Sequence, residues 1–357
     1  MRIIQMLPVL AFGDAIGNDT VTLKKTLQQA GYETEIYAEI IDGRLPKDTA
    51  FPVMDYDERS DDIIIYHLST GAELNYKFER FKCRKIIMYH NITPPEFFSD
   101  YNTEAAMSCK EGLSAAEFLS DKVDFCFADS EFNKHDLRKM GYECEIDVLP
   151  ILIAFKDFEK KPNAGILKKY GNDDYVNIVF TGRVAPNKKH EDIIRAFYYY
   201  KKYINVKSRL FLVGSFGIND RYYQRLAKYV EKLGVKEVYF TGHIKFDEIL
   251  AYYSIADVFL CLSEHEGFCV PLVEAMYFNV PIIAYDCCAV GETLGNAGLL
   301  LSDKSPEIVG EAIHRVVSDE KLKEIMVSNG KERLEYFSHD RIKNQFLESV
   351  QRLIKGV

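Results

Sequence analysis

The feature of this 357-residue sequence that most constrains its fold is an alternation of short apolar runs with segments of helical period. The apolar runs are rich in β-branched and aromatic residues, which is typical of strands in parallel sheets joined by helices. The alternation occurs twice, on either side of a charged, proline-bearing segment at 149–163. A chain of this length also exceeds what one hydrophobic core usually organises. The sequence therefore predicts two α/β domains.

In the first domain we expect strands at residues 2–10, 33–39, 62–66, 85–89, 125–128 and 145–149, with helices near 21–30, 105–119 and 133–140. In the second we expect strands at 176–181, 209–213, 238–240, 258–262 and 281–284, with helices near 189–203, 221–233, 247–254 and 272–278. Apolar residues recur at helical spacing in 340–355, which indicates an amphipathic last helix. We set the domain boundaries at 1–160 and 161–339, and the last helix, at 340–357, must bury its apolar face elsewhere on the protein.

Composition limits the class of protein. The formal net charge is −9, which argues against a general nucleic-acid binder because phosphate recognition requires a basic excess. The eight cysteines form no C-x-x-C pair, and the adjacent Cys287 and Cys288 are poorly placed to bond each other, so we expect a reducing cytoplasm. No apolar run approaches the roughly 18 residues of a membrane span, so we expect at most peripheral membrane contact.

The segment 264–276 reads as a loop followed by the start of a helix. Gly267 permits unusual backbone angles and Pro271 suits a first helical turn, so we expect free backbone amides near 270–272 that could bind an anion. Glu266 and Glu274 have two interpretations on spacing alone. They are either ligands for sugar and ribose hydroxyls or ordinary acidic residues at a helix entry.

The segment 181–188 joins a predicted strand to a predicted helix and carries Arg183 and Lys188. Two fixed cations at such a turn could bind an anionic ligand group and compensate its charge. The alternative is solvated charge near a helix start, and we adopt that interpretation for Lys189.

The first half offers fewer candidates. Residues 12–20 join the first strand to the first helix, and their glycines either let the backbone approach a ligand or simply form a turn. His67 and His90 each end a predicted strand, where a parallel sheet binds ligands, although a lone histidine is often structural.

Two of these segments resemble a known family. Glu266-x7-Glu274, within E-G-F-x-x-P-x-x-E-A-M, closely resembles the E-x7-E motif of GT-B retaining glycosyltransferases, particularly glycosyltransferase family 4. The segment Thr181–Lys188 resembles the G-R-x4-K segment of that family. The resemblance is specific from 181 to 297. It implies the GT-B fold, in which two Rossmann-like parallel-sheet domains face a cleft and the last helix returns to the first domain.

The resemblance also implies an activity. We expect a hexosyltransferase that moves a sugar from a nucleotide-diphosphate donor, GDP-mannose or a UDP-hexose, to a glycan or lipid-linked acceptor in cell-surface polysaccharide synthesis. His90 is expected to meet the donor sugar, Gly17 the donor phosphates, and residues 240–244 the base. The expected catalytic residues are Glu266, His90, Arg183 and Lys188. The expected donor-binding residues are Gly17, Gly182, Arg183, Lys188, His243, Ile244, Glu266, Gly267, Phe268, Val270, Pro271, Leu272 and Glu274.

We expect neither a metal nor a cofactor. Asp55-Tyr56-Asp57 has the form of the metal-binding D-x-D of GT-A enzymes, but it lies in an acid-rich stretch that we interpret as a solvated loop. A sugar phosphorylase would need a pyridoxal-phosphate lysine and a longer chain. The remaining alternative is a non-catalytic nucleotide-sugar-binding subunit.

Five basic residues gather between 77 and 85. They are Lys77, Arg80, Lys82, Arg84 and Lys85. They form either a solvated helix face or a contact with an anionic membrane at the inner face of the cell envelope.

Overall fold

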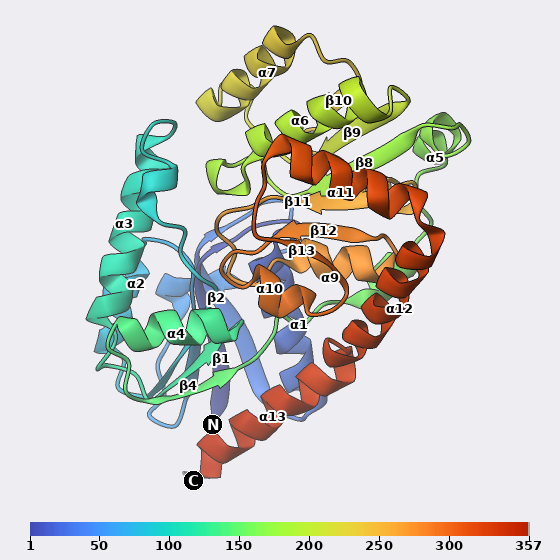
Figure 1. The fold of residues 1–357 in the computed structure, drawn as a ribbon. Helices are drawn as coiled ribbons and strands as arrows, with labels where there is room; N and C mark the ends of the chain where they lie inside the picture. The colour runs from blue at the N-terminus through green and yellow to red at the C-terminus, as the bar shows by residue number, and fades with distance from the viewer. Residues whose placement is uncertain (356–357) are drawn as a thin grey trace. The chain divides into compact units, whose positions relative to one another are not determined.

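The computed structural model describes residues 1–355 and divides them into two compact units (Figure 1). Unit 1 contains Met1–Ser99, Thr103–Phe155 and the C-terminal segment from Phe337, and unit 2 contains Asp100–Asn102 and Lys156–Tyr336. The observed boundaries lie after Phe155 and before Phe337, whereas the predicted boundaries lie after residue 160 and before residue 340. The segment 100–102 interrupts unit 1, because its residue Tyr101 packs on the core of unit 2.

Unit 1 is built on a parallel sheet of seven strands in the order β3-β2-β1-β4-β5-β6-β7. Its strands are β1 (Arg2–Leu10), β2 (Glu33–Ile41), β3 (Phe51–Pro52), β4 (Ile63–Leu68), β5 (Arg84–Tyr89), β6 (Phe125–Ala128) and β7 (Glu145–Val148). Its α-helices are α1 (Ala15–Gln29), α2 (Glu73–Lys77), α3 (Thr103–Phe118), α4 (Glu131–Lys139) and α13 (His339–Lys355). The sequence predicted all of these strands except the two-residue β3.

The predicted amphipathic C-terminal helix is α13, drawn in red in Figure 1. It buries Ile342, Phe346 and Val350 in the core of unit 1, where the Phe346 ring lies 5.7 Å from that of Phe127. The last helix therefore packs on the first unit, as the family resemblance implies.

Unit 2 contains a parallel sheet of six strands in the order β10-β9-β8-β11-β12-β13. Its strands are β8 (Val176–Thr181), β9 (Ser208–Val213), β10 (Val238–Phe240), β11 (Val258–Cys261), β12 (Ile282–Tyr285) and β13 (Gly298–Leu301). Its α-helices are α5 (Ala164–Tyr170), α6 (His190–Tyr199), α7 (Arg221–Leu233), α8 (Phe246–Ser254), α9 (Val270–Tyr277), α10 (Val290–Leu294), α11 (Pro306–Ser318) and α12 (Glu320–Tyr336). The prediction missed β13, a four-residue strand at the edge of the sheet.

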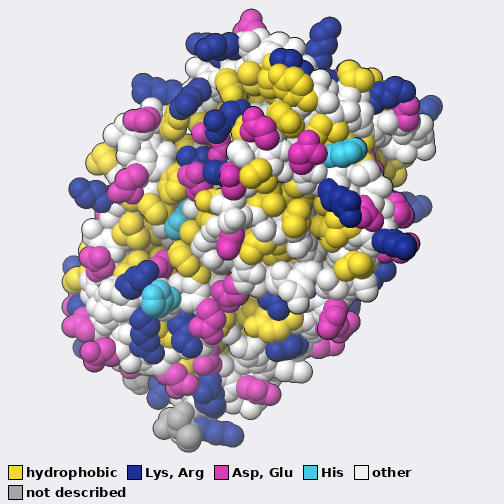
Figure 2. Space-filling view, viewed as in Figure 1, with side chains coloured by type: hydrophobic (Ala, Val, Ile, Leu, Met, Phe, Trp, Pro, Cys, Tyr) yellow, Lys and Arg dark blue, Asp and Glu magenta, His cyan; other side chains and the backbone are white. Residues whose placement is uncertain are grey.

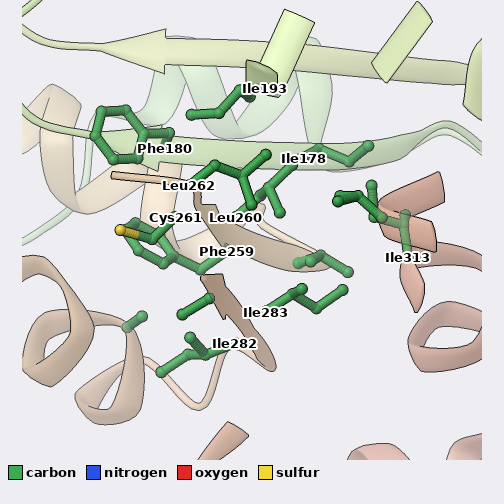
Figure 3. Close-up of a cluster of buried hydrophobic side chains, with 14 of the residues drawn as sticks. Ile178, Phe180, Ile193, Phe259, Leu260, Cys261, Leu262, Ile282, Ile283 and Ile313 are labelled. Atoms are coloured by element: carbon green, nitrogen blue, oxygen red, sulfur yellow. The ribbon is translucent and has the colours of Figure 1, made fainter. Parts of the chain in front are cut away.

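The core of unit 2 fixes the ends of its strands. Phe180 from β8 and Phe259 from β11 pack in the same cluster as Ile283 from β12 (Figure 3). Because these strands are parallel and in register, their carboxyl ends, at Thr181 and Cys261, lie at the same edge of the sheet. The two motif-bearing loops both start at this edge.

On the face of the molecule shown in Figure 2, basic and acidic side chains are intermixed. None of the helices within residues 1–355 combines the length and the apolar character needed to cross a bilayer.

Candidate functional site

The loop after β8 begins with a constrained turn. Gly182 has φ +151°, which disfavours a residue with a side chain, and the neighbouring Gly214 lies so close that a Cβ there would be 2.0 Å from the Gly182 carbonyl oxygen. Arg183 follows this turn and is exposed. Among residues 1–355 its guanidinium has no hydrogen bond or ion pair, so it is available to an anionic ligand.

Lys188 and Glu266 bring the two predicted motifs together. The Lys188 ammonium donates to both carboxylate oxygens of Glu266, each at 2.6 Å. Burial alone would lower the pKa of Lys188, but the charge of Glu266 outweighs burial and raises it. The side chains are 22% and 8% exposed, so this ion pair lies at the surface edge of the core and Lys188 stays charged.

The start of α9 differs from the prediction. Cys269 precedes the helix with φ 72° and ψ 63°, a left-handed turn that reverses the chain before Val270. The amide of Leu272, expected to be free, donates to the Cys269 carbonyl oxygen at 3.0 Å, because the turn places that oxygen over the first helical turn. Pro271 has no N–H. The expected array of free amides at 270–272 is therefore wrong in its Leu272 member.

Glu274 is held in place by a hydrogen bond from another side chain of unit 2. The Tyr253 hydroxyl donates to Glu274 Oε2 at 2.6 Å and also contacts Thr181 Oγ1 at the end of β8. Burial raises the pKa of Glu274, while the hydrogen bond from Tyr253 opposes that rise. Tyr253 thus links the second glutamate of the motif to the strand that carries Gly182 and Arg183.

A second group of charges supports the same loops and was not predicted. Lys304 Nζ lies 2.7 Å from Asp192 Oδ2 and also pairs with Glu264, which in turn lies 2.9 Å from Lys189 Nζ. Burial acts to raise the pKa of Glu264, but the two lysines outweigh it and lower that pKa. Lys189, interpreted from the sequence as solvated, is an ion-pair partner whose side chain is only 26% exposed.

The remaining predicted donor residues of unit 2 lie in the loops after β10 and β11. His243 is exposed and Ile244 half-buried in the loop after β10, and Gly267 is half-buried. Phe268 is buried, and its carbonyl oxygen accepts a hydrogen bond from the Thr293 hydroxyl at 2.6 Å.

In unit 1, His90 and His67 are hydrogen-bonded to each other at 2.8 Å between His90 Nε2 and His67 Nδ1. Both predicted strand-end histidines therefore belong to one buried cluster. Gly17 lies on the first turn of α1, where a Cβ would be 2.9 Å from the Ala11 carbonyl oxygen. Only glycine permits this close approach of α1 to the end of β1.

Two groups of side chains within residues 1–355 have the geometry to hold a metal ion. One is Asp19, His67 and His90, and the other is Cys261, Glu266 and Cys269. Ligand atoms of both groups already take part in hydrogen bonds: His67 and His90 bond each other, and Glu266 bonds Lys188. The exposed Asp55 and Asp57 belong to neither group.

The basic residues at 77–85 are partly engaged within unit 1. Lys77 pairs with Glu73 at 2.7 Å, and Lys85 donates to the carbonyl oxygens of Glu79 and Phe81.

Residues 166–333 match the family model of the glycosyl transferases group 1. The matched segment lies within unit 2 and contains both motifs. The sequence of this chain is 24% identical over 317 residues to the O-antigen chain mannosyltransferase B of Escherichia coli, covering 86% of this chain and 78% of that protein. The recognition of a group 1 glycosyltransferase from Glu266-x7-Glu274 and the segment Thr181–Lys188 is thereby confirmed.

The fold of this glycosyltransferase is similar to that of solved structures. Sucrose-phosphate synthase of Thermosynechococcus elongatus superposes with a TM-score of 0.79 at 18% identity, with both chains fully covered. HepE of Anabaena, solved in complex with UDP-glucose, superposes with a TM-score of 0.73 at 17% identity, covering 98% of this chain and 100% of that one. These likenesses confirm the predicted GT-B fold.

Proposed function

We propose that this glycosyltransferase transfers a hexose from a nucleoside-diphosphate sugar to a hydroxyl of a glycan or lipid-linked acceptor, with retention of anomeric configuration and without a metal ion. The observation that carries the proposal is the ion pair between Lys188 and Glu266. It joins two motifs 78 residues apart in the sequence. The exposed Arg183 lies in the same connection between β8 and α6.

Lys188 is suited to bind the donor diphosphate. An ammonium group has three N–H donors, and Lys188 uses two of them on the Glu266 oxygens. The third N–H is left for a phosphate oxygen, and Arg183 adds a planar fork of donors. These two cations compensate the charge that develops on the leaving diphosphate, which is the task a divalent ion performs in metal-dependent transferases.

The two glutamates are suited to bind hydroxyl groups. Each Glu266 oxygen keeps a lone pair that can accept from a sugar hydroxyl, and the partly exposed Glu274 carboxylate can accept from a ribose hydroxyl. Both carboxylates are held by a neighbouring donor, Lys188 and Tyr253 respectively. Neither resembles the free nucleophile of a retaining glycosidase, which supports a front-face substitution in which the leaving diphosphate accepts the acceptor proton.

The donor classes that we propose are GDP-mannose and UDP-hexoses. The E. coli relative is named a mannosyltransferase of the O-antigen chain, and the Anabaena structure holds UDP-glucose. The same relative supports a role in cell-surface polysaccharide synthesis. All eight cysteines of this chain are free thiols, which supports a reducing cytoplasmic location, at the inner face of the membrane if the acceptor is lipid-linked.

The test is donor turnover by the purified protein. The protein is incubated with GDP-mannose, UDP-glucose or UDP-galactose and a simple alkyl glycoside, with and without EDTA, and the new anomeric proton is followed by NMR. We expect one donor to be consumed, a product with the anomeric configuration of that donor, and no loss of rate in EDTA. Lys188→Ala is expected to abolish turnover, whereas Lys189→Ala, the matched control, keeps it.

An inverted product would refute retention, and a rate abolished by EDTA and restored by a divalent ion would refute metal independence. Donor binding without turnover on any acceptor would indicate the non-catalytic subunit instead.

A further inference from the structure

Four buried side chains in unit 1 form one continuous hydrogen-bonded chain. Asp129 Oδ2 lies 3.0 Å from His90 Nδ1, His90 Nε2 lies 2.8 Å from His67 Nδ1, and His67 Nε2 lies 3.0 Å from Gln5 Oε1. The His90 and Asp129 side chains are 1% and 3% exposed, and Gln5 and His67 are fully buried. The planes of the two imidazole rings are inclined by 4° to each other and their centroids lie 5.1 Å apart, which is compatible with an in-plane N–H···N hydrogen bond.

The Gln5 end of this hydrogen-bonded series fixes the direction of the two bonds that a neutral His67 makes. Gln5 Nε2 lies 3.0 Å from the backbone oxygen of Thr20, which can only accept, so the Gln5 amide donates there and turns its oxygen to His67. His67 Nε2 must then donate to that oxygen. A neutral His67 consequently accepts at Nδ1, and His90 Nε2 must carry a proton. The Thr20 hydroxyl, 3.4 Å from His67 Nδ1, gives its own proton to the Ile16 carbonyl oxygen.

The near end adds the second proton. Asp129 presents a carboxylate oxygen to His90 Nδ1, so an N–H at that atom completes the bond. His90 then holds a proton on each nitrogen and is an imidazolium, whereas His67 is a neutral ring. With a neutral His67 and an ionised Asp129, the hydrogen-bond directions therefore assign a proton to both nitrogens of His90.

The electrostatic surroundings agree with this assignment. Burial acts to lower the pKa of His90, but the charge and hydrogen bond of Asp129, with the more distant Asp19 and Asp14, outweigh it and raise that pKa. Burial and the charge of His90 together hold the pKa of His67 well below its ordinary value. The charged and titratable groups facing His90 are therefore three carboxyl groups and one neutral imidazole.

We propose that Asp129, His67 and Gln5 are positioning residues that hold His90 as an imidazolium at the carboxyl end of β5. In terms of the proposed function, on which this step rests, parallel sheets bind ligands at that edge. The positive ring of His90 favours an anionic ligand group there, of the class of the donor diphosphate. Because both ring nitrogens are engaged inside the protein, His90 acts through its charge rather than by donating to the sugar, and its deprotonation at high pH reduces transfer.

The test is a titration of the full-length protein labelled with 15N-histidine. Long-range 1H–15N spectra report whether each imidazole nitrogen carries a proton, and the exposed His314 serves as the internal reference. We expect both His90 nitrogens to be protonated at neutral pH, with a midpoint above that of His314, and His67 to be protonated only at Nε2. Asp129→Asn is expected to move the His90 midpoint below that of His314.

Asp19→Asn is the matched control, because it removes a carboxyl group that faces His90 without touching the Asp129 bond, and a smaller shift is expected. In the donor-turnover assay the alkaline limb of kcat/KM should move to lower pH in Asp129→Asn and return toward wild type in Asp129→Glu. An unprotonated His90 Nδ1 at neutral pH, with the proton on Asp129, overturns the proposal, and so does a midpoint that Asp129→Asn leaves in place. The NMR titration of His90 can be measured even if the protein has no transferase activity. Failure of the proposed function can therefore be distinguished from failure of this proposal.

Discussion

Asp19 provides a prediction about stability and pH in unit 1. Its side chain is buried on α1, where its Oδ1 accepts from the Leu152 amide at 2.8 Å. Burial, opposed by the charge of His90, raises the pKa of Asp19 from 3.8 to about 7. The folded state therefore holds this proton more tightly than the unfolded state, so unit 1 loses stability as the pH rises from 3.8 and has lost the full amount above pH 7.

The magnitude follows from the shift. Each pH unit between the two pKa values costs about 1.4 kcal/mol, so the whole shift corresponds to about 4 kcal/mol. Asp19→Asn keeps the oxygen that accepts from Leu152 but cannot ionise. Between pH 5 and pH 8 the stability of the variant relative to wild type should therefore rise by about 3 kcal/mol.

Native-state hydrogen exchange of peptides from β4 and β5 measures this difference. Comparison at the same pH cancels the intrinsic exchange rates, and about 3 kcal/mol corresponds to roughly a hundredfold difference in protection. Asp48→Asn, which changes an exposed carboxylate, is the control and should show no pH-dependent difference. If the protection of Asp19→Asn and wild type changes in parallel from pH 5 to pH 8, the assignment of a buried, protonated Asp19 is wrong.

Three further predictions concern single contacts. Gly214→Ala should weaken binding of nucleoside diphosphates at least tenfold, because its Cβ would lie 2.0 Å from the Gly182 oxygen, whereas Gly217→Ala, with no neighbour nearer than 3.9 Å, should bind normally in calorimetry. Tyr253→Phe should destabilise unit 2 by about 1–3 kcal/mol in urea, since it leaves Glu274 and the buried Thr181 without the hydroxyl that they contact; an unchanged midpoint would contradict this. Phe346→Ala should destabilise unit 1 by about 3–5 kcal/mol and leave exchange in unit 2 unchanged.

The sequence predicted most strands of the fold because even a short run of buried, β-branched residues is recognisable as a strand. The central strands of both sheets were expected within a few residues, since they are fully buried and β-branched. The strands that were missed are short edge strands: β3 has two residues, and β13 begins at a glycine. Too few residues lie in either strand for a period to be recognised. The helices α2, α5, α10, α11 and α12 were also missed.

Only those residues of the candidate site that lie within a recognisable motif could be predicted from the sequence. Arg183, Lys188, Glu266 and Glu274 come from segments whose spacing resembles a family, and their assignment to the donor remains a prediction. Lys304 gave no signal, because its partners lie 40 and 112 residues away in the sequence and only the tertiary fold brings them together.

The contacts of His90 show the same limit. The strand end predicted that the histidine lies at a ligand-binding edge. Its contacts come from elsewhere in the sequence: Asp129 follows the end of β6, and Gln5, which bonds His67, lies on β1. The directions of the hydrogen bonds around His90, on which its charge depends, cannot be predicted from the sequence alone. The free amide expected at Leu272 failed for a related reason, since the left-handed turn at Cys269 is a property of the folded loop.

The central claim is that Arg183 and Lys188 bind one diphosphate group. Isothermal titration of UDP and GDP into wild type, Arg183→Ala, Lys188→Ala and Lys189→Ala measures this directly. We predict that one nucleotide binds wild type, that the Arg183 and Lys188 variants each bind at least tenfold more weakly, and that Lys189→Ala stays within twofold. Equal affinity of all four proteins for the nucleotide would contradict the claim.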